Sequence, residues 1–174
     1  MSRDEKGLSI VPLGPEDLPA ALGIQSAAYP PFLVEDERAF RSRIDLAASY
    51  CLAAKREGVL LGYILAHGWH RGAPPPVGAV LSEGVASEIL YIHDLAVAPA
   101  GRGLNIGRRL VTHVFELAAR DGLREAELIA VERAADYWQM LGFGEPPEGG
   151  DLAAKLRSYG PSARWMPCRS PPAR

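Results

Sequence analysis

The segment from Leu90 to Leu110, which reads LYIHDLAVAPAGRGLNIGRRL, constrains the fold of this chain more than any other segment. An apolar run ends at Val97, a glycine-containing loop follows, and an amphipathic helix begins directly after the loop. A strand that leads into a helix in this way presents backbone N–H groups at the helix N-terminus, where anions bind. The segment therefore predicts an anion site at the end of a strand.

Another strand is predicted after this helix, and two strands joined by a helical crossover lie parallel in one sheet. Earlier in the chain, Glu57-Gly58 separates two apolar runs, which is typical of a hairpin. The pattern as a whole predicts an α/β chain. The expected strands are Leu8–Pro12, Tyr50–Arg56, Val59–His67, Ser87–Val97, Ala126–Val131 and Ala163–Cys168. The expected helices are Pro15–Ala28, Asp36–Ala47, one from Ile106 that ends before Gly122, Ala134–Leu141 and Asp151–Ser158.

The composition narrows the class of protein. With 174 residues, 48% of them apolar, the chain can bury a sizeable core, and we expect residues 1–174 to form a single domain. The formal net charge is −2, so the chain lacks the excess of basic residues that is typical of nucleic-acid-binding proteins, and no nucleic-acid partner is expected. Because no stretch resembles a membrane span or a signal peptide, we expect a cytoplasmic protein without a membrane partner. Cys51 and Cys168 lack metal-ligand spacing, so neither a metal nor a disulfide is expected.

The loop from Arg102 to Gly107 differs from two well-known glycine loops. It lacks the Gly-Lys-Ser/Thr ending of a Walker A loop and the G-x-G-x-x-G of a dinucleotide site. Its spacing alone leaves two interpretations open, a turn with a structural role and an anion site. Arg102, Arg108 and Arg109 favour the anion site, because cations near a helix N-terminus are unfavourable unless a bound anion compensates them.

Two motifs occur in this chain in a characteristic order. The first is the strand Tyr91–Val97 with Pro99 and the loop Arg102–Gly107, and the second is the aromatic pair and Leu-Gly-Phe of Tyr137–Phe143. With both motifs present, nearly the whole chain resembles the GNAT superfamily of acetyl-CoA-dependent N-acetyltransferases. The resemblance implies an α/β fold with a central mixed, mostly antiparallel sheet of about six to seven strands. This sheet would include a splayed parallel pair and be flanked by about four helices.

The resemblance also implies that acetyl-CoA is the cosubstrate. Its pyrophosphate would lie on the backbone N–H groups of the loop, and its pantetheine arm would lie along the preceding strand. The short helix near the second motif would flank its other side. The implied cofactor-binding residues are Leu95, Ala96, Val97, Arg102, Gly103, Leu104, Asn105, Ile106, Gly107, Arg108 and Trp138.

The chain departs from the family pattern at two positions. Asn105 stands where the family has glycine, and because asparagine tolerates the left-handed region, we expect the loop to form at small cost. Trp138 stands where many members have the tyrosine that protonates the departing CoA thiolate. An indole N–H cannot act as an acid near neutral pH. The neighbouring Tyr137 lies about 100° further around the helix and is not a simple substitute.

The reaction also needs a group that takes a proton from the amine. His93 has a suitable ordinary pKa, and it falls where arylalkylamine N-acetyltransferases, loosely the most similar branch, carry a histidine. Strict alternation places Tyr91, His93 and Leu95 on one face of the strand and turns Asp94 to the other face, in a structural role. We predict His93, Tyr91 and Tyr137 as catalytic residues. The alternative is that His93 only forms a hydrogen bond in a half-buried strand.

The acceptor side is less well determined by the sequence. Tyr29, Phe32 and Trp69 are predicted to line an apolar or cation-binding slot, and residues 35–37 (Glu-Asp-Glu) could attract an ammonium. The alternatives are ordinary core aromatics and the solvated start of a helix, where acidic residues are favoured anyway.

The resemblance implies direct transfer of an acetyl group from acetyl-CoA to the primary amine of a small molecule in a ternary complex. No covalent intermediate is expected, because neither cysteine lies in a motif with a base. The alternatives are acetylation of amino acids, polyamines or protein and peptide N-termini. A CoA-binding sensor or partner module with little catalysis is a further alternative, which Trp138 favours. The sequence allows a homodimer and does not identify the amine.

Overall fold

The computed structural model describes residues 7–82, 86–145 and 152–169, and in these residues six strands form one sheet with the order β1-β2-β3-β4-β5-β6. The strands are β1 Leu8–Pro12, β2 Leu52–Arg56, β3 Val59–Trp69, β4 Ile89–Val97, β5 Ala126–Ala130 and β6 Arg164–Cys168. Neighbouring strands are antiparallel except β4 and β5, which are parallel. The predicted mixed, mostly antiparallel sheet is confirmed.

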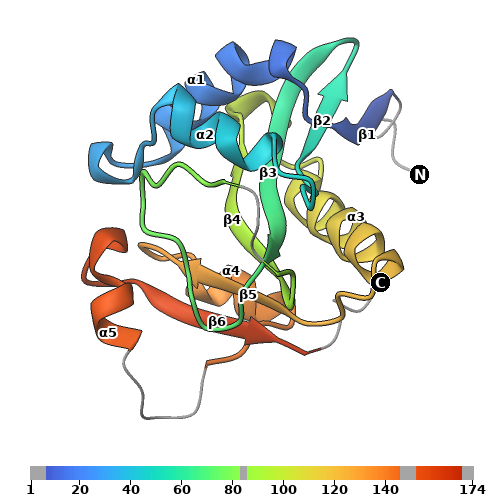
Figure 1. The fold of residues 1–174 in the computed structure, drawn as a ribbon. Coiled ribbons are helices and arrows are strands. Elements are labelled where there is room, and N and C mark those ends of the chain that lie inside the picture. Colours follow the sequence, from blue (N-terminus) through green and yellow to red (C-terminus); the bar gives the residue numbers. More distant parts are fainter. Residues whose placement is uncertain (1–6, 83–85, 146–151, 170–174) are drawn as a thin grey trace.

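Helices cover both faces of the sheet (Figure 1). The described helices are α1 Leu18–Ala28, α2 Glu37–Ile44, α3 Ile106–Arg120, α4 Ala135–Met140 and α5 Leu152–Lys155. The predicted second helix begins as expected, because the Asp36 carboxylate accepts a hydrogen bond from the Ala39 N–H at 2.8 Å, but it ends earlier, at Ile44. Asp151, the expected start of the last helix, lies outside the described residues. None of the described helices is both long and apolar enough to span a membrane.

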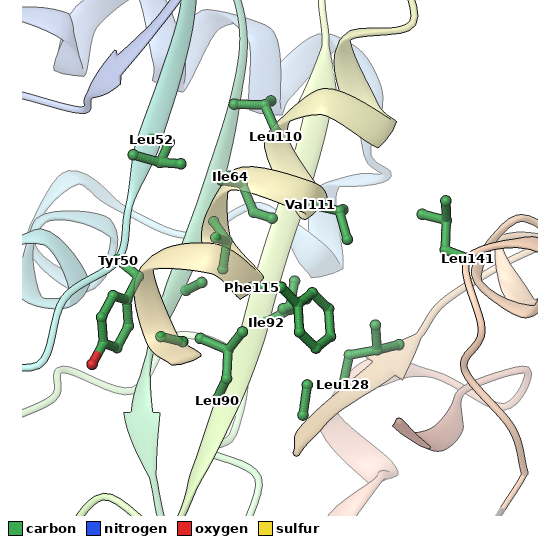
Figure 2. Close-up of a cluster of buried hydrophobic side chains, with 14 of the residues drawn as sticks. Tyr50, Leu52, Ile64, Leu90, Ile92, Leu110, Val111, Phe115, Leu128 and Leu141 are labelled. Carbon is green, nitrogen blue, oxygen red and sulfur yellow. The ribbon is translucent and has the colours of Figure 1, made fainter. Parts of the chain in front are cut away.

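The larger core lies between α3 and the sheet, with α4 beside it (Figure 2). Residues of α3 at spacings of three and four, including Leu110, Val111 and Phe115, are buried against Ile64 and Ile92 of the central strands. Burial of each such side chain stabilises the fold by about 1.5–3 kcal/mol. The predicted apolar face of this helix is therefore the interface that fixes α3 on the sheet.

A second core fills the opposite face, beneath α1 and α2. Leu18 of α1 and Phe40 of α2 are buried there against Tyr63 and Leu65 of β3. Phe40 meets the Tyr63 ring edge to face, with the ring centroids 5.2 Å apart. This core leaves the Tyr63 hydroxyl beside β4, where it becomes part of the candidate site.

The parallel strands β4 and β5 separate along their length. They pair only from Leu90 to Ile92 in β4, opposite Ala126 to Leu128 in β5. The expected splayed parallel pair is thereby confirmed. The carboxyl-terminal half of β4 consequently has backbone groups on that side without a partner strand.

An extra residue in β4 changes which side chains share a face. Leu65 of β3 pairs with Asp94, but the next residue, Ala66, pairs with Ile92, so the register passes over His93. This is a β-bulge, and it places His93 and Asp94 on the same face of the sheet. The prediction that Asp94 points away from His93 is therefore wrong, because strict alternation does not continue through a bulge.

Candidate active site

The loop before α3 has the conformation expected of an anion site. A 3₁₀ turn, Pro99–Gly101, follows β4, and Asn105 then adopts φ 56° and ψ 27° directly before the helix. The prediction that asparagine can occupy this left-handed position is confirmed. Arg109 donates its backbone N–H to the Asn105 carbonyl at 3.2 Å. The N–H groups of the preceding helical residues have no carbonyl within the helix to bond and are directed outward from its N-terminus.

A groove of about 350 Å³ lies over this loop. It is lined by Leu95, Val97, Gly101, Arg102, Gly103, Asn105, Ile106, Gly107, Arg108 and Tyr137. Most of the predicted cofactor-binding residues therefore face one groove. Three of them are not in its lining, because Leu104 packs against the larger core, Trp138 is buried in that core and Ala96 is buried in the second core.

The aromatic pair of α4 occupies two different environments. Trp138 is buried, and its ring lies edge to face against both Tyr137 and Phe143, with centroids 5.4 Å apart in each pair. The Tyr137 hydroxyl reaches the start of α3, where a Cβ added to Gly107 would lie 2.2 Å from it. Tyr137 lines both the groove and a second cavity, so it stands where the two spaces meet.

The second cavity has a volume of about 340 Å³ and lies where β4 and β5 separate. Its lining includes Tyr29, Leu33, Glu35, Val77, His93, Asp94, Ile129, Tyr137, Trp138 and Tyr159. Of the three predicted acceptor residues, Tyr29 lines this cavity, whereas Phe32 and Trp69 lie outside its described lining. Phe32 is 52% exposed with its ring against Gly160, and the Trp69 indole donates to the Ala73 carbonyl at 2.7 Å.

His93 belongs to a buried chain of charged and polar groups. Its Nε2 atom lies 2.5 Å from Glu35 Oε1, and Glu35 Oε2 lies 3.0 Å from Nη2 of Arg43 in an ion pair. The Gly78 N–H donates to the same Glu35 oxygen at 2.7 Å. The interpretation of Glu35 as part of a solvated helix start is wrong, because its side chain is only 3% exposed.

The surroundings set the protonation of this chain. Burial lowers the pKa of His93, the Arg43 charge lowers it further, and Glu35 only partly opposes both. Burial alone would raise the pKa of Glu35, but the hydrogen bond and charge of His93, the charge of Arg43 and the Gly78 N–H together lower it. Glu35 is therefore a carboxylate and His93 a neutral imidazole near pH 7. With Nε2–H donated to Glu35, the lone pair of His93 is on Nδ1, which is buried without a partner among the described residues.

Asp94 is held by the hydroxyl groups of two tyrosines. The Tyr63 hydroxyl donates to Asp94 Oδ2 at 2.5 Å, and the Tyr29 hydroxyl, which donates to the Leu95 carbonyl at 2.8 Å, also interacts with the Asp94 carboxyl. The pKa of Asp94 is raised above its ordinary value, because the effect of burial outweighs that of the two hydroxyls, which lower it. The sequence predicts only a structural role for Asp94, since nothing in a linear pattern reveals the bulge.

The segment of residues 73–82, which we call the cover loop, lies beside the cavity and contributes Val77 to its lining. The Tyr159 hydroxyl donates to the Pro75 carbonyl and lies 3.3 Å from the buried Tyr91 hydroxyl. The Val77 N–H donates to Ser158 Oγ at 3.1 Å, and Gly78 contacts Glu35 as described above. Tyr91 therefore supports the cover loop through Tyr159, and it is not one of the described residues that line the cavity.

Arg43, Tyr63 and Tyr159 are site residues that sequence analysis missed. Arg43 lies on a predicted surface helix and Tyr63 in an apolar strand, so neither pattern signals a functional contact. One signal for Arg43 is its position three residues after Phe40, which places both on the buried face of α2. A fully buried arginine needs a carboxylate partner. No group of three His, Cys, Asp or Glu side chains in the described residues is placed to hold a metal ion.

Comparisons with known proteins agree with this geometry. The model of a family described as acetyltransferase (GNAT) matches residues 19–143. The structure of Ard1 from Thermoplasma volcanium has a TM-score of 0.71 at 13% identity, covering 94% of this chain and 98% of that chain. The ribosomal-protein-S18-alanine N-acetyltransferase from Escherichia coli has a TM-score of 0.66 at 18% identity, covering 96% of each chain.

A third similar structure is Naa50 from Arabidopsis thaliana in complex with the bisubstrate analogue CoA-Ac-MVNAL. Its TM-score is 0.66 at 16% identity, covering 92% of this chain and 97% of that chain. At these identities the likeness shows the fold. No curated protein matches the sequence.

The buried histidines predict a pH dependence of stability. His67 is buried beside Tyr91, and burial lowers its pKa to about 3, so it takes up a proton near pH 6 only after unfolding. His93 acts in the same direction. The free energy of unfolding should fall as the pH is lowered from about 6.5 to 5, with a slope from His67 that rises toward a limit of about 1.4 kcal/mol per pH unit. Urea unfolding at several pH values should show this slope reduced in His67→Gln, and equal slopes would contradict the assignment.

Proposed function

The chain belongs to the acetyltransferase (GNAT) family, and we propose that it transfers the acetyl group of acetyl-CoA to the primary amine of a small molecule by direct attack. This proposal rests mainly on one observation: Tyr137 lines both the groove over the N-terminus of α3 and the cavity that contains His93. A cosubstrate in the groove and an acceptor in the cavity would meet there.

The groove fits the anionic part of acetyl-CoA. Pyrophosphate needs N–H donors and positive charge, and the N-terminus of α3 with the side chains of Arg102 and Arg108 supplies both. The half of β4 beyond Ile92 has no partner strand on the β5 side, which leaves room for the pantetheine arm along Leu95 and Val97. When bound, acetyl-CoA supplies an activated acetyl group as a thioester.

His93 is proposed as the general base. Its neutral state and its partnerless Nδ1 allow it to take the proton that the acceptor amine must lose. Glu35 holds the ring through Nε2 and favours the required tautomer, and it would also stabilise the imidazolium that forms. Glu35 and Arg43 are positioning residues in this scheme, because both act through His93.

Tyr137 is proposed as the proton donor to the departing thiolate. Trp138 cannot fill this role, since its indole N–H is not acidic near neutral pH. Burial raises the pKa of Tyr137, although the Arg108 charge lowers it, so the phenol remains protonated at neutral pH. Its position between groove and cavity supports this role.

The position of the cover loop favours a small molecule over a peptide as the acceptor. Leu33, Val77 and Tyr159 line the cavity, and the Val77 and Gly78 N–H groups tie the cover loop to the side chains of Ser158 and Glu35. A peptide would need an open path through this wall. A peptide acceptor is nevertheless the main alternative, since one similar structure is a ribosomal-protein-S18-alanine N-acetyltransferase.

The activity is tested by release of free CoA from acetyl-CoA, measured with a thiol reagent across a panel of acceptors. The panel contains benzylamine, 2-phenylethylamine, n-hexylamine, spermidine, L-glutamate and an Ala-initiated pentapeptide. We expect turnover with one or more of the small amines and little with the peptide. Tight CoA binding without turnover of any acceptor would favour a CoA-binding module, and preference for the peptide would contradict the small-molecule assignment.

Replacement of the proposed base should slow the reaction without loss of the fold. In His93→Gln the side-chain amide can still donate to Glu35, but no basic nitrogen remains, so kcat should fall by about 10²–10⁴-fold at neutral pH. The KM for acetyl-CoA should be unchanged. His113→Gln, at an exposed position on α3, is the matched control and should retain activity. Activity of His93→Gln within twofold of wild type would exclude His93 as the base.

The narrow space at Gly107 gives a test of the groove. In Gly107→Ala the new Cβ would lie 2.2 Å from the Tyr137 hydroxyl, so Tyr137 must move. We expect the KM for acetyl-CoA to rise about tenfold, equivalent to about 1.4 kcal/mol, together with a loss of kcat. Gly23→Ala, where a Cβ meets nothing within 4 Å, is the control.

The double variant Gly107→Ala/Tyr137→Phe removes the overlapping hydroxyl. It should restore part of the affinity for acetyl-CoA while kcat stays low. An unchanged KM in Gly107→Ala would show that acetyl-CoA does not lie against the start of α3.

A further inference from the structure

The buried charges around the cavity do not balance. The Arg43 guanidinium, which is fully buried, forms an ion pair with Glu35 at 3.0 Å, and His93 is neutral. Asp94 is also buried, yet no lysine or arginine in the described residues forms an ion pair with it. A buried carboxylate that accepts only hydroxyl hydrogen bonds is costly, and a cation beside it would reduce that cost.

The direction of Asp94 is fixed from three sides. The bulge turns it to the face of His93, Tyr63 donates to Oδ2 at 2.5 Å, and Tyr29, which directly follows α1, interacts with its carboxyl. Asp94 and His93 both line the cavity. The charged and titratable groups that face Asp94 are these two tyrosines, His93 and Glu35.

A second observation points to a ligand at the same place. His93 Nδ1 is buried and has no hydrogen-bond partner among the described residues. The His93 side chain as a whole is only 4% exposed. A buried lone pair without a donor is as unfavourable as a buried donor without an acceptor. An N–H-bearing cation between Asp94 and His93 would satisfy both groups.

More than half of the residues that line the cavity are apolar. Leu33, Val77, Leu128 and Ile129 are among them. Among the described lining residues the one cation is Arg133, which is exposed, as is its neighbour Glu132. The buried part of the cavity thus combines one unbalanced negative charge with hydrocarbon walls.

We infer, building on the proposed function, that Asp94 binds the ammonium group of the acceptor and thereby selects small amines with an apolar body and no carboxylate beside the nitrogen. The ammonium donates one N–H to the Asp94 carboxylate and another to His93 Nδ1. His93 then takes the proton of the N–H that is donated to it. The amine becomes neutral, and its lone pair is available for attack. A carboxylate on the carbon beside the nitrogen would lie close to Asp94 and Glu35, and the like charges would repel it.

The test is binding to the CoA-saturated protein, measured by isothermal titration with three probes of similar size. The probes are 2-phenylethylamine, its uncharged analogue 2-phenylethanol, and L-phenylalanine, which adds the carboxylate. Wild type should bind the amine more tightly than either analogue by about 10- to 100-fold, the range expected for a charge-assisted hydrogen bond in a buried site.

Asp94→Asn keeps an oxygen for the Tyr63 hydroxyl and removes only the charge. It should lose about 10- to 100-fold in affinity for 2-phenylethylamine and leave 2-phenylethanol unchanged. Asp136→Asn, at an exposed position on α4, is the matched control and should alter neither. Tyr63→Phe, which keeps the charge and removes one hydroxyl, should weaken amine binding less than Asp94→Asn does, and thermal melts confirm that each variant is folded.

The outcomes separate this inference from the proposed function. If wild type turns over small amines but Asp94→Asn binds 2-phenylethylamine normally, the acetyltransferase assignment stands and the role of Asp94 is wrong. Equal losses for the amine and the alcohol would also overturn it, because a purely structural role predicts them. The same holds if wild type prefers L-phenylalanine or binds the amine no better than the alcohol. Charge-selective binding without turnover would support Asp94 and contradict the proposed reaction.

Discussion

The extra residue in β4 is the constraint on which the site depends. Without it, His93 and Asp94 would lie on opposite faces of the sheet, one of them directed into the core beneath α3. With it, both line the same cavity while Ile92 and Leu95, three residues apart, still contribute to the larger core. A bulge costs some ladder pairing and is retained where it redirects a side chain. The strand thereby supplies core residues on one face and two adjacent polar side chains on the other.

Burial of these polar groups has a stability cost that the fold offsets in part. A buried ion pair such as that of Arg43 with Glu35 contributes little net stability, because desolvation cancels most of the attraction. Its effect here is on geometry and protonation, since Glu35 fixes the His93 ring and Arg43 helps keep His93 neutral. The residues that make the site are therefore less stabilising than apolar residues of the same size would be.

How much could be predicted from the sequence depended on whether the signal was local. The strand Tyr91–Val97, the loop Arg102–Gly107 and the apolar face of α3 form one continuous segment, so the splayed parallel pair and the left-handed Asn105 are predicted from the sequence and confirmed. The assignment of this loop to acetyl-CoA stays a prediction. The role of Asp94 was not predicted, because a bulge depends on pairing with β3. Arg43 and Tyr159 could not be predicted as site residues for a related reason: they come from separate segments and reach the site only through tertiary packing.

The two halves of the site are consequently built in different ways. The groove is made by one stretch of chain, in which Gly107 leaves room for the Tyr137 hydroxyl, so changes there affect the loop and the helix together. The cavity is made by Tyr29, Leu33 and Glu35 before α2, the cover loop, and Tyr159 after α5, each tied down by a few hydrogen bonds. Substitution of Val77 would change the cavity wall without removing a hydrogen bond to β4, whereas Tyr29 and Glu35 bond to Leu95 and His93 of that strand. Asp94 and His93 lie on β4 between the halves, so the proton transfer that we propose can stay the same while the apolar walls of the cavity vary.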